Sequence, residues 1–356
     1  MKYNYSMIKI ARESRKLTQD ELAKRLGISQ VAVHKIETGL SQISDDLVDK
    51  LAAHLNYPAS FFQNETKVIN AGVRLHRKRL ALNKKDEGYI DALMSIFTMS
   101  ISKFLEYVDL EVNLPEILID EYVSAYDVAD KLRELWKVPC GSINNLISYL
   151  EGNGIFVFEV DCDFSTFDAV SAYNNTLGVG IIIINKNQSP DRYRFTLAHE
   201  LGHIIMHRSS ISPNIEKEAN CFASAFLMPR NDIFDELVDL KFWDLPQYKQ
   251  KWKVSMAALI YRASDLNAID SKRYASLNVR LSQEGYKKNE PLCGLEKERP
   301  SLFKDLLTYF VTNLQYSEKD ILSVLNLFRE DYIKYFDLPY SNNFSPKIVN
   351  IDNYRK

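Results

Sequence analysis

Residues 194–205 have the sequence Arg-Phe-Thr-Leu-Ala-His-Glu-Leu-Gly-His-Ile-Ile. The two histidines, His199 and His203, are four residues apart, so on a helix they lie one turn apart on the same face. Both imidazoles can then reach one metal ion. Glu200 can take a proton from a water held at an open coordination position and later pass it to a leaving amine. The stretch therefore predicts a metal-binding helix over about residues 191–207, with Glu200 as the catalytic base.

A third metal ligand is available in residues 216–229, Glu-Lys-Glu-Ala-Asn-Cys-Phe-Ala-Ser-Ala-Phe-Leu-Met-Pro. This segment predicts a second helix, over about residues 214–228. At about 100° per residue, Glu216 falls on the stripe that also carries small and apolar residues. Completion of a His₂Glu zinc site explains a carboxylate there. Glu218 falls on the opposite face, where we expect it to be solvated, and it is the alternative ligand.

Two further polar residues accompany these ligands. Asn220 lies one turn beyond Glu216 and can accept a hydrogen bond from the free ring N–H of a histidine ligand, thereby orienting it. The alternative for Asn220 is a structural bond to backbone. His207 is eight residues from His199, a rise of about 12 Å on a helix, so both cannot bind one metal. We expect His207 to contact a metal-ligating residue, to line the cleft or to lie on the surface.

A different pattern occupies residues 17–39, Leu-Thr-Gln-Asp-Glu-Leu-Ala-Lys-Arg-Leu-Gly-Ile-Ser-Gln-Val-Ala-Val-His-Lys-Ile-Glu-Thr-Gly. Thr18 and Glu21 have the spacing of a helix capping box. Gly27 supplies a turn where positive φ is easiest, and Ser29 caps the next helix. This is the pattern of a helix-turn-helix.

The second helix of that pattern has an outward face at its start, where a recognition helix meets base edges. Val33 and Ile36 are expected to face inward. The outward residues are Gln30, Val31, His34 and Lys35. The segment resembles the Cro/C1-type (XRE-like) repressor domain over about 50 residues. The resemblance implies that Gln30, Val31 and Lys35 contact bases and that Gln19 contacts a phosphate.

Composition places the chain among ordinary globular proteins. Of its 356 residues 46% are hydrophobic and 26% charged, and two or three domains are expected. The net charge of −2 gives no global attraction to nucleic acid, so DNA contact must come from a local patch. Through Tyr57 there are nine Lys/Arg against seven Asp/Glu, so the first domain is only weakly basic and a homodimer is expected.

Several absences favour a cytoplasmic protein. The four cysteines are far apart and form no Cys-x-x-Cys pair, which suits a reducing compartment. No apolar run approaches about 18 residues, and the first residues lack the apolar segment of a signal peptide, so we expect no membrane partner.

The middle of the chain changes character. Residues 154–160 and 178–185 are rich in β-branched or aromatic residues and bounded by glycine or asparagine, so they predict strands, with a third at 168–173. The expected fold class is α+β and predominantly helical. The expected domains are a helix-turn-helix domain (1–64), a helical connector (65–150), a zincin-like metallopeptidase domain with a small β-sheet (151–290) and a helical C-terminal extension (291–356).

The two metal-site segments together resemble the ImmA/IrrE metallopeptidase family, from roughly residue 123 to residue 291. The similarity includes residues 132–136, Leu-Arg-Glu-Leu-Trp, and a second helix-turn-helix-like unit at 252–262. The family implies a zincin-like fold, zinc bound by the positions of His199, His203 and Glu216, and Glu200 as general base. It also implies cleavage of Cro/C1-type repressors, relieving repression after stress or in mobile elements.

Two functions therefore remain open. The first is a regulator that binds a double-stranded DNA operator and also carries a zinc-dependent endopeptidase, which cleaves a partner repressor or itself. The second is a catalytically silent regulator or antitoxin-like protein whose metallopeptidase fold senses a ligand or binds a partner. His₂Glu favours zinc, although manganese and iron accept the same ligand types.

Overall fold

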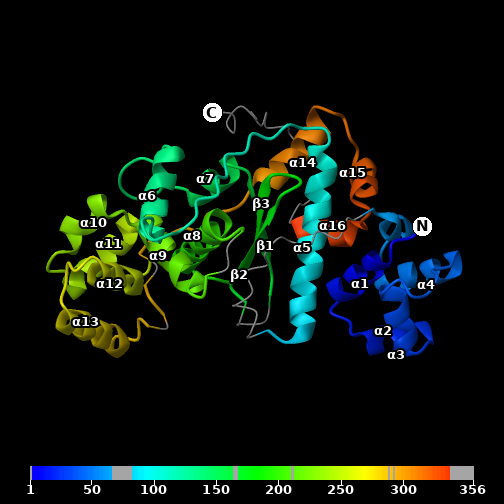
Figure 1. The fold of residues 1–356 in the computed structure, drawn as a ribbon, viewed down its shortest axis with the longest axis horizontal. Coiled ribbons are helices and arrows are strands. Elements are labelled where there is room, and N and C mark those ends of the chain that lie inside the picture. Colours follow the sequence, from blue (N-terminus) through cyan, green and yellow to red (C-terminus); the bar gives the residue numbers. More distant parts are fainter. Residues whose placement is uncertain are drawn as a thin grey trace. The chain divides into compact units, whose positions relative to one another are not determined.

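The computed structural model describes residues 2–65, 82–162, 167–209, 212–287, 289–291 and 293–336. The chain forms two compact units. Of the described residues, the first unit contains 2–65, 82–111 and 301–336, and the second contains those between 112 and 300. Within the described residues a single three-stranded sheet lies among many helices, which confirms the expected α+β, predominantly helical class (Figure 1).

The first unit begins with short helices: α1 (Tyr5–Ser14), α2 (Gln19–Leu26), α3 (Gln30–Glu37), α4 (Asp45–Leu55) and the 3₁₀ turn η1 (Ala59–Gln63). The capping signals predicted from the sequence are all present. Thr18 and Glu21 form the capping box of α2, and Ser29 accepts a hydrogen bond from the Ala32 backbone N–H at the start of α3. Gly27 has φ of 67°, the left-handed conformation that a tight turn between the helices requires. Helices α2 and α3 are thus a helix-turn-helix.

Four more helices complete the first unit: α5 (Lys84–Leu105), α14 (Leu302–Thr312), α15 (Glu318–Leu325) and α16 (Arg329–Phe336). Helix α5, the long cyan helix of Figure 1, packs against α1 and α15. Aromatic rings join the C-terminal half of α5 to the helices that follow residue 301. Phe97 lies 5.8 Å from Phe336, and Phe104 lies 4.7 Å from Phe310, measured between ring centroids.

The second unit contains the sheet, built from β1 (Ile155–Val160), β2 (Ala169–Asn174) and β3 (Val179–Asn185). The strand order is β1-β3-β2, with β1 parallel and β2 antiparallel to β3. The register pairs Ile155 with Gly180 on one side of β3 and Ser171 with Ile182 on the other. All three predicted strands are therefore confirmed, and β2 is an edge strand of this sheet.

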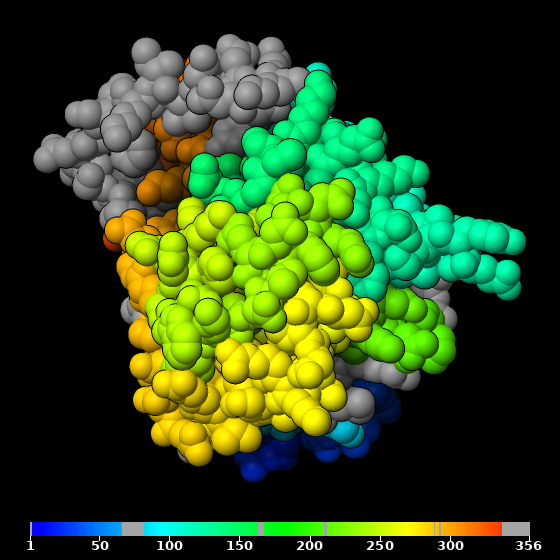
Figure 2. Space-filling view, turned by 90° about the vertical axis from the view of Figure 1, so that its left-hand side faces the viewer, coloured from blue at the N-terminus to red at the C-terminus, as the bar shows by residue number. Residues whose placement is uncertain are grey.

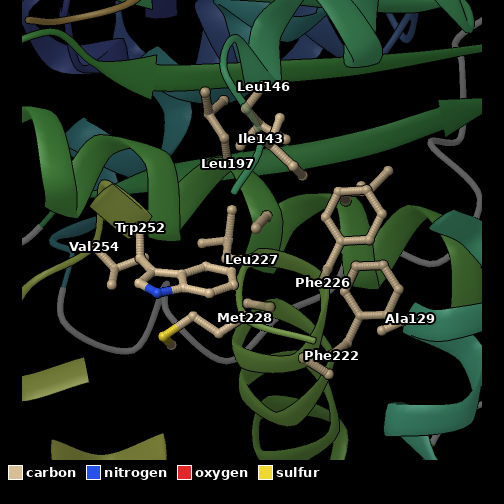
Figure 3. Packing of buried hydrophobic residues seen from close by; sticks show 14 of the residues in the cluster. Ala129, Ile143, Leu146, Leu197, Phe222, Phe226, Leu227, Met228, Trp252 and Val254 are labelled. Carbon is tan, nitrogen blue, oxygen red and sulfur yellow. The ribbon is translucent and has the colours of Figure 1, made fainter. Parts of the chain in front are cut away.

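Helices α6 (Ala125–Leu135), α7 (Leu146–Gly152), α8 (Pro190–Met206) and α9 (Ile215–Leu227) surround the core of the second unit. The bounds of α8 and α9 agree closely with the two predicted helices. Phe222 and Phe226 stack on one face of α9 and lie beside Ala129 of α6, while Leu227 and Trp252 meet on the other side (Figure 3). Large buried rings on two sides hold α9 in place against α8 and α6.

The remaining elements of this unit are α10 (Arg230–Leu237), η3 (Phe242–Asp244), α11 (Leu245–Trp252), α12 (Met256–Asp265) and α13 (Ser271–Gln283). They form the yellow-green to yellow surface of Figure 2. Helices α11 and α12 repeat the turn of the first unit. Lys253 has a left-handed backbone (φ 56°), and Ser255 caps α12 by accepting from the Ala258 N–H. Met256 and Ile260 of α12 are fully buried, so the start of this helix is part of the core.

The domain ranges expected from the sequence cut across the two units. Of the expected connector, α5 belongs to the first unit and α6 and α7 to the second, while α14–α16 complete the first. Residues 108–120 of that connector form neither helix nor strand, although a mostly helical segment was expected. From residue 112 onward this segment belongs to the second unit, and its backbone bonds to α8, as in the Ile117 N–H donating to the Ile205 carbonyl (3.0 Å). An amphipathic pattern shows that a helix buries one face but not which partner covers it.

Candidate functional site

Helix α8 carries His199, Glu200 and His203 into the interior of the second unit. Pro190 opens the helix, where its missing N–H costs nothing, and most of the following side chains are buried. The three residues are 2%, 4% and 3% exposed. Buried imidazole and carboxylate groups are costly without polar partners, so each of these three side chains needs a hydrogen-bond or charge partner.

Gly202 allows α9 to approach α8 closely. A Cβ atom at this position would lie 2.9 Å from the Phe222 ring and 3.4 Å from the Ala219 Cα atom, so any side chain would push the helices apart. The close approach brings Glu216, in the first turn of α9, toward the two histidines. The glycine between His199 and His203 is thus required by the packing of α9 against α8.

The side chains of His199, His203 and Glu216 converge, with one ligand atom from each lying within 4.8 Å of the others. The Nε2 atoms of His199 and His203 are 3.0 Å apart, and they lie 3.5 Å and 3.6 Å from the two Glu216 carboxylate oxygens. In a tetrahedral zinc site with bonds of about 2.0–2.2 Å, ligand atoms are separated by roughly 3.3–3.5 Å. The spacing and the ligand types therefore both suit zinc.

Asn220 orients His199. Its Oδ1 atom lies 2.9 Å from His199 Nδ1, and because an amide oxygen only accepts, the imidazole must carry its proton on Nδ1. The lone pair of His199 is then on Nε2, which faces His203 and Glu216. A lone pair directed at a second imidazole and at a carboxylate is unfavourable unless a cation lies among them. The donor set thus fits a bound divalent metal.

The helix-turn-helix residues lie in the first unit. Gln30, Val31, His34 and Lys35 of α3 are all exposed, Val31 to 61%, whereas Val33 and Ile36 on the opposite face are buried. The predicted inward and outward faces of this helix are therefore confirmed. The exposed face combines amide, cationic and apolar groups, which are the groups that contact base edges in the major groove.

Gln19 occupies the first turn of α2 and is half-buried. Its side-chain nitrogen donates to the Glu37 carboxylate (2.9 Å), which also binds the buried Arg12 guanidinium. These bonds tie α2 to the end of α3 and fix the direction of the Gln19 side chain. An amide nitrogen has a second N–H to donate, so this contact leaves a donor available to another acceptor.

Two family models match the chain. Residues 8–62 match the family described as helix-turn-helix. Residues 152–264 match the peptidase M78 family, described as IrrE N-terminal-like domain. The chain carries both domains. A search of curated proteins found no match.

The IrrE N-terminal-like domain contains α8 and α9 entirely, and with them every residue of the converging cluster. The helix-turn-helix match contains α2, α3 and the exposed residues described above. In the described part of the chain, no helix is long and apolar enough to cross a membrane.

Ser171 of β2 is a partner that sequence analysis missed. Its hydroxyl donates to the Glu200 carboxylate at 2.6 Å, and its side chain is buried. A serine at an inward position of a predicted strand was the available signal, since a buried hydroxyl needs a partner. The sequence does not show which helix covers that face of the strand.

Glu218 is placed differently from the sequence expectation of a solvated side chain. Its carboxylate accepts from His207 Nε2 (2.9 Å) and from the Ser212 hydroxyl (2.7 Å). His207 is 1% exposed, and its Nδ1 atom lies 3.0 Å from Nδ1 of His203. Burial lowers the pKa of His207, an effect that the Glu218 carboxylate opposes. The expectation was wrong because the end of α8 lies beside the face of α9 that carries Glu218. Helical periodicity shows which face Glu218 occupies, but not which element lies beside that face.

Proposed function

We propose that this chain is a DNA-binding transcriptional regulator whose IrrE N-terminal-like domain is a zinc-dependent endopeptidase. The observation that carries the proposal is the convergence of two imidazole nitrogens and a carboxylate within 4.8 Å, from residues on two helices. His199, His203 and Glu216 would hold the metal, and this His₂Glu set leaves a fourth position for water or substrate.

Zinc in such a site supplies a Lewis acid that polarises the peptide carbonyl and acidifies a water molecule. Glu200 follows the first ligand on α8, and its carboxylate would accept the proton of the attacking water and then deliver it to the leaving amine nitrogen. Ser171 would hold that carboxylate through its 2.6 Å hydrogen bond. Asn220 would orient His199 as a ligand through the ring nitrogen opposite the metal.

The proposed substrate is a protein, either a Cro/C1-type repressor or this chain itself, whose cleavage relieves repression. The presence of a helix-turn-helix domain in the same chain supports this, because DNA binding would place the endopeptidase at an operator. Resemblance to the ImmA/IrrE family favours the same substrate class. A response to stress is the setting that this family implies.

The proposed nucleic-acid partner is a double-stranded operator bound by a homodimer. A single recognition helix on a weakly basic domain gives modest affinity, and two half-sites about one helical turn apart compensate for it. The base-contacting residues would be Gln30, Val31, His34 and Lys35, with Gln19 at a phosphate.

The decisive experiment measures bound metal and proteolysis together. The zinc-loaded protein is incubated with a purified Cro/C1-type repressor encoded beside it, and fragments are analysed by mass spectrometry. Wild type and Glu134→Gln, an exposed control on α6, should cleave, whereas Glu200→Gln should retain metal and fold but lose about 10²–10⁴ in rate or more.

Two results would overturn this proposal. Undiminished cleavage by metal-loaded Glu200→Gln would remove Glu200 as the base. Metal binding without cleavage of the repressor or of the chain itself would favour the catalytically silent regulator that senses a ligand or binds a partner.

A further inference from the structure

A row of hydrogen bonds leads away from His203 on the side opposite the proposed metal. His203 Nδ1 lies 3.0 Å from His207 Nδ1, and His207 Nε2 lies 2.9 Å from the Glu218 carboxylate. Ser212 donates to the other oxygen of that carboxylate at 2.7 Å. The row joins two consecutive turns at the end of α8 to the first turn of α9.

The direction of each bond follows from the chemistry of the groups. An ionised carboxylate only accepts, so His207 carries a proton on Nε2. In the neutral ring its Nδ1 then holds a lone pair and can only accept. The remaining proton must therefore lie on Nδ1 of His203, which leaves the lone pair of His203 on Nε2, the atom that faces His199 and Glu216.

We propose that Glu218, acting through His207, is the positioning residue that fixes His203 in the tautomer able to bind the metal. This inference rests on the metal site of the proposed function. The two proposed histidine ligands would thus be oriented by different hydrogen-bond partners. Asn220 acts on His199 directly, whereas Glu218 reaches His203 through a second imidazole and a carboxylate held by Ser212.

Removal of the Glu218 carboxylate should release this arrangement. His207 could then carry its proton on Nδ1 and donate to His203, which would place the His203 proton on Nε2, where it blocks the metal. Loss of partners that orient metal ligands typically weakens metal binding by about 10–100-fold. The metal would still bind, because His199, His203 and Glu216 remain.

The test has two readouts, neither of which requires proteolysis. Zinc affinity is measured by competition with a chromophoric chelator in wild type, Glu218→Ala and Lys217→Ala, the last an exposed neighbour on α9. Long-range ¹H–¹⁵N spectra of the metal-free proteins report the tautomer of each histidine. We expect Glu218→Ala to bind zinc about 10–100-fold more weakly and to lose the Nδ1–H tautomer of His203, while Lys217→Ala matches wild type.

Unchanged zinc affinity in folded Glu218→Ala, or an unchanged His203 tautomer, would overturn the inference. If Glu218→Ala does not fold, Glu218→Leu replaces it. That variant keeps a side chain of similar volume but has no group that can accept from His207 Nε2–H, and the same two readouts decide. Failure of the proposed function is distinguishable, because a wild type that binds no zinc would refute the metal site while the metal-free spectra still test the row of bonds.

Discussion

Arg15, the residue that follows α1, and Asp331 of α16 form a bidentate, largely buried ion pair although they are 316 positions apart in the chain. Arg15 Nη1 and Nη2 donate to the two Asp331 oxygens at 2.6 and 2.5 Å. The Asp331 side chain is 6% exposed, and the Arg15 guanidinium also lies 4.1 Å from the centroid of the Tyr57 ring. The C-terminal helix therefore contributes directly to the unit that holds the helix-turn-helix.

Replacement of Asp331 by alanine should destabilise the first unit. It leaves the Arg15 cation largely buried without its carboxylate partner, and such a loss costs about 3–5 kcal/mol. Unfolding in urea, monitored by far-UV circular dichroism, gives the free energy of unfolding. Glu330→Ala, an exposed neighbour on the same helix, is the matched control. Equal unfolding midpoints for the two variants would show that the ion pair contributes nothing to this unit.

The proposed metal ligands lie in the second unit and lead to a separate prediction. We expect one divalent metal per chain, and loss of the metal in His199→Ala, His203→Ala and Glu216→Ala, because two ligands rarely hold zinc in a protein site. Glu218→Ala should still bind one metal, though more weakly. Elemental analysis of the purified variants, after dialysis against buffered zinc, gives the stoichiometry. The reverse pattern for Glu216 and Glu218 would assign the third ligand to Glu218.

Ser171→Ala should slow catalysis without releasing the metal. The hydroxyl donates to Glu200 rather than to a metal ligand, so its removal affects only the position of the proposed base. A hydrogen bond to a charged group contributes about 1.5–3 kcal/mol, which corresponds to roughly 10–100-fold in rate. The comparison is kcat and bound zinc for Ser171→Ala against Ser282→Ala, an exposed serine on α13. A reduced zinc content in Ser171→Ala would contradict this separation of roles.

The sequence predicted the elements of the site better than their surroundings. The four-residue spacing of His199 and His203 and the stripe of α9 are local patterns, and the helices α8 and α9 follow them closely. The Thr18 capping box and the turn at Gly27 are local too, and both are present. Such features depend on residues a few positions apart, so one sequence suffices to infer them.

Contacts between distant elements could not be obtained in this way. Ser171 meets Glu200 because β2 packs against α8, and Glu218 meets His207 because the end of α8 lies beside the start of α9. Asp331 and Arg15 meet because α16 closes the first unit. Each case requires knowing which apolar face covers which, and hydrophobic periodicity shows only that a face is buried.

The exposed face of α3 predicts which side chains contact the operator. Gln30→Ala should weaken operator binding by about 1–3 kcal/mol and relax the preference at one base pair, because an amide that bonds to a base edge reads that base. Lys35→Ala should weaken binding as well. Lys50→Ala, an exposed cation on α4 paired with Asp46, is the charge-matched control and should have little effect.

These affinities are measured by fluorescence anisotropy on a labelled operator found by footprinting, at one fixed salt concentration, because phosphate contacts make affinity strongly salt-dependent. The same titration in the presence of a chelator should give the same affinity. The proposed recognition residues belong to the first compact unit, whereas the proposed metal ligands belong to the second, which has its own hydrophobic core. An operator complex that is lost with chelator, or one indifferent to both Gln30 and Lys35, would mean that α3 does not read the DNA as proposed.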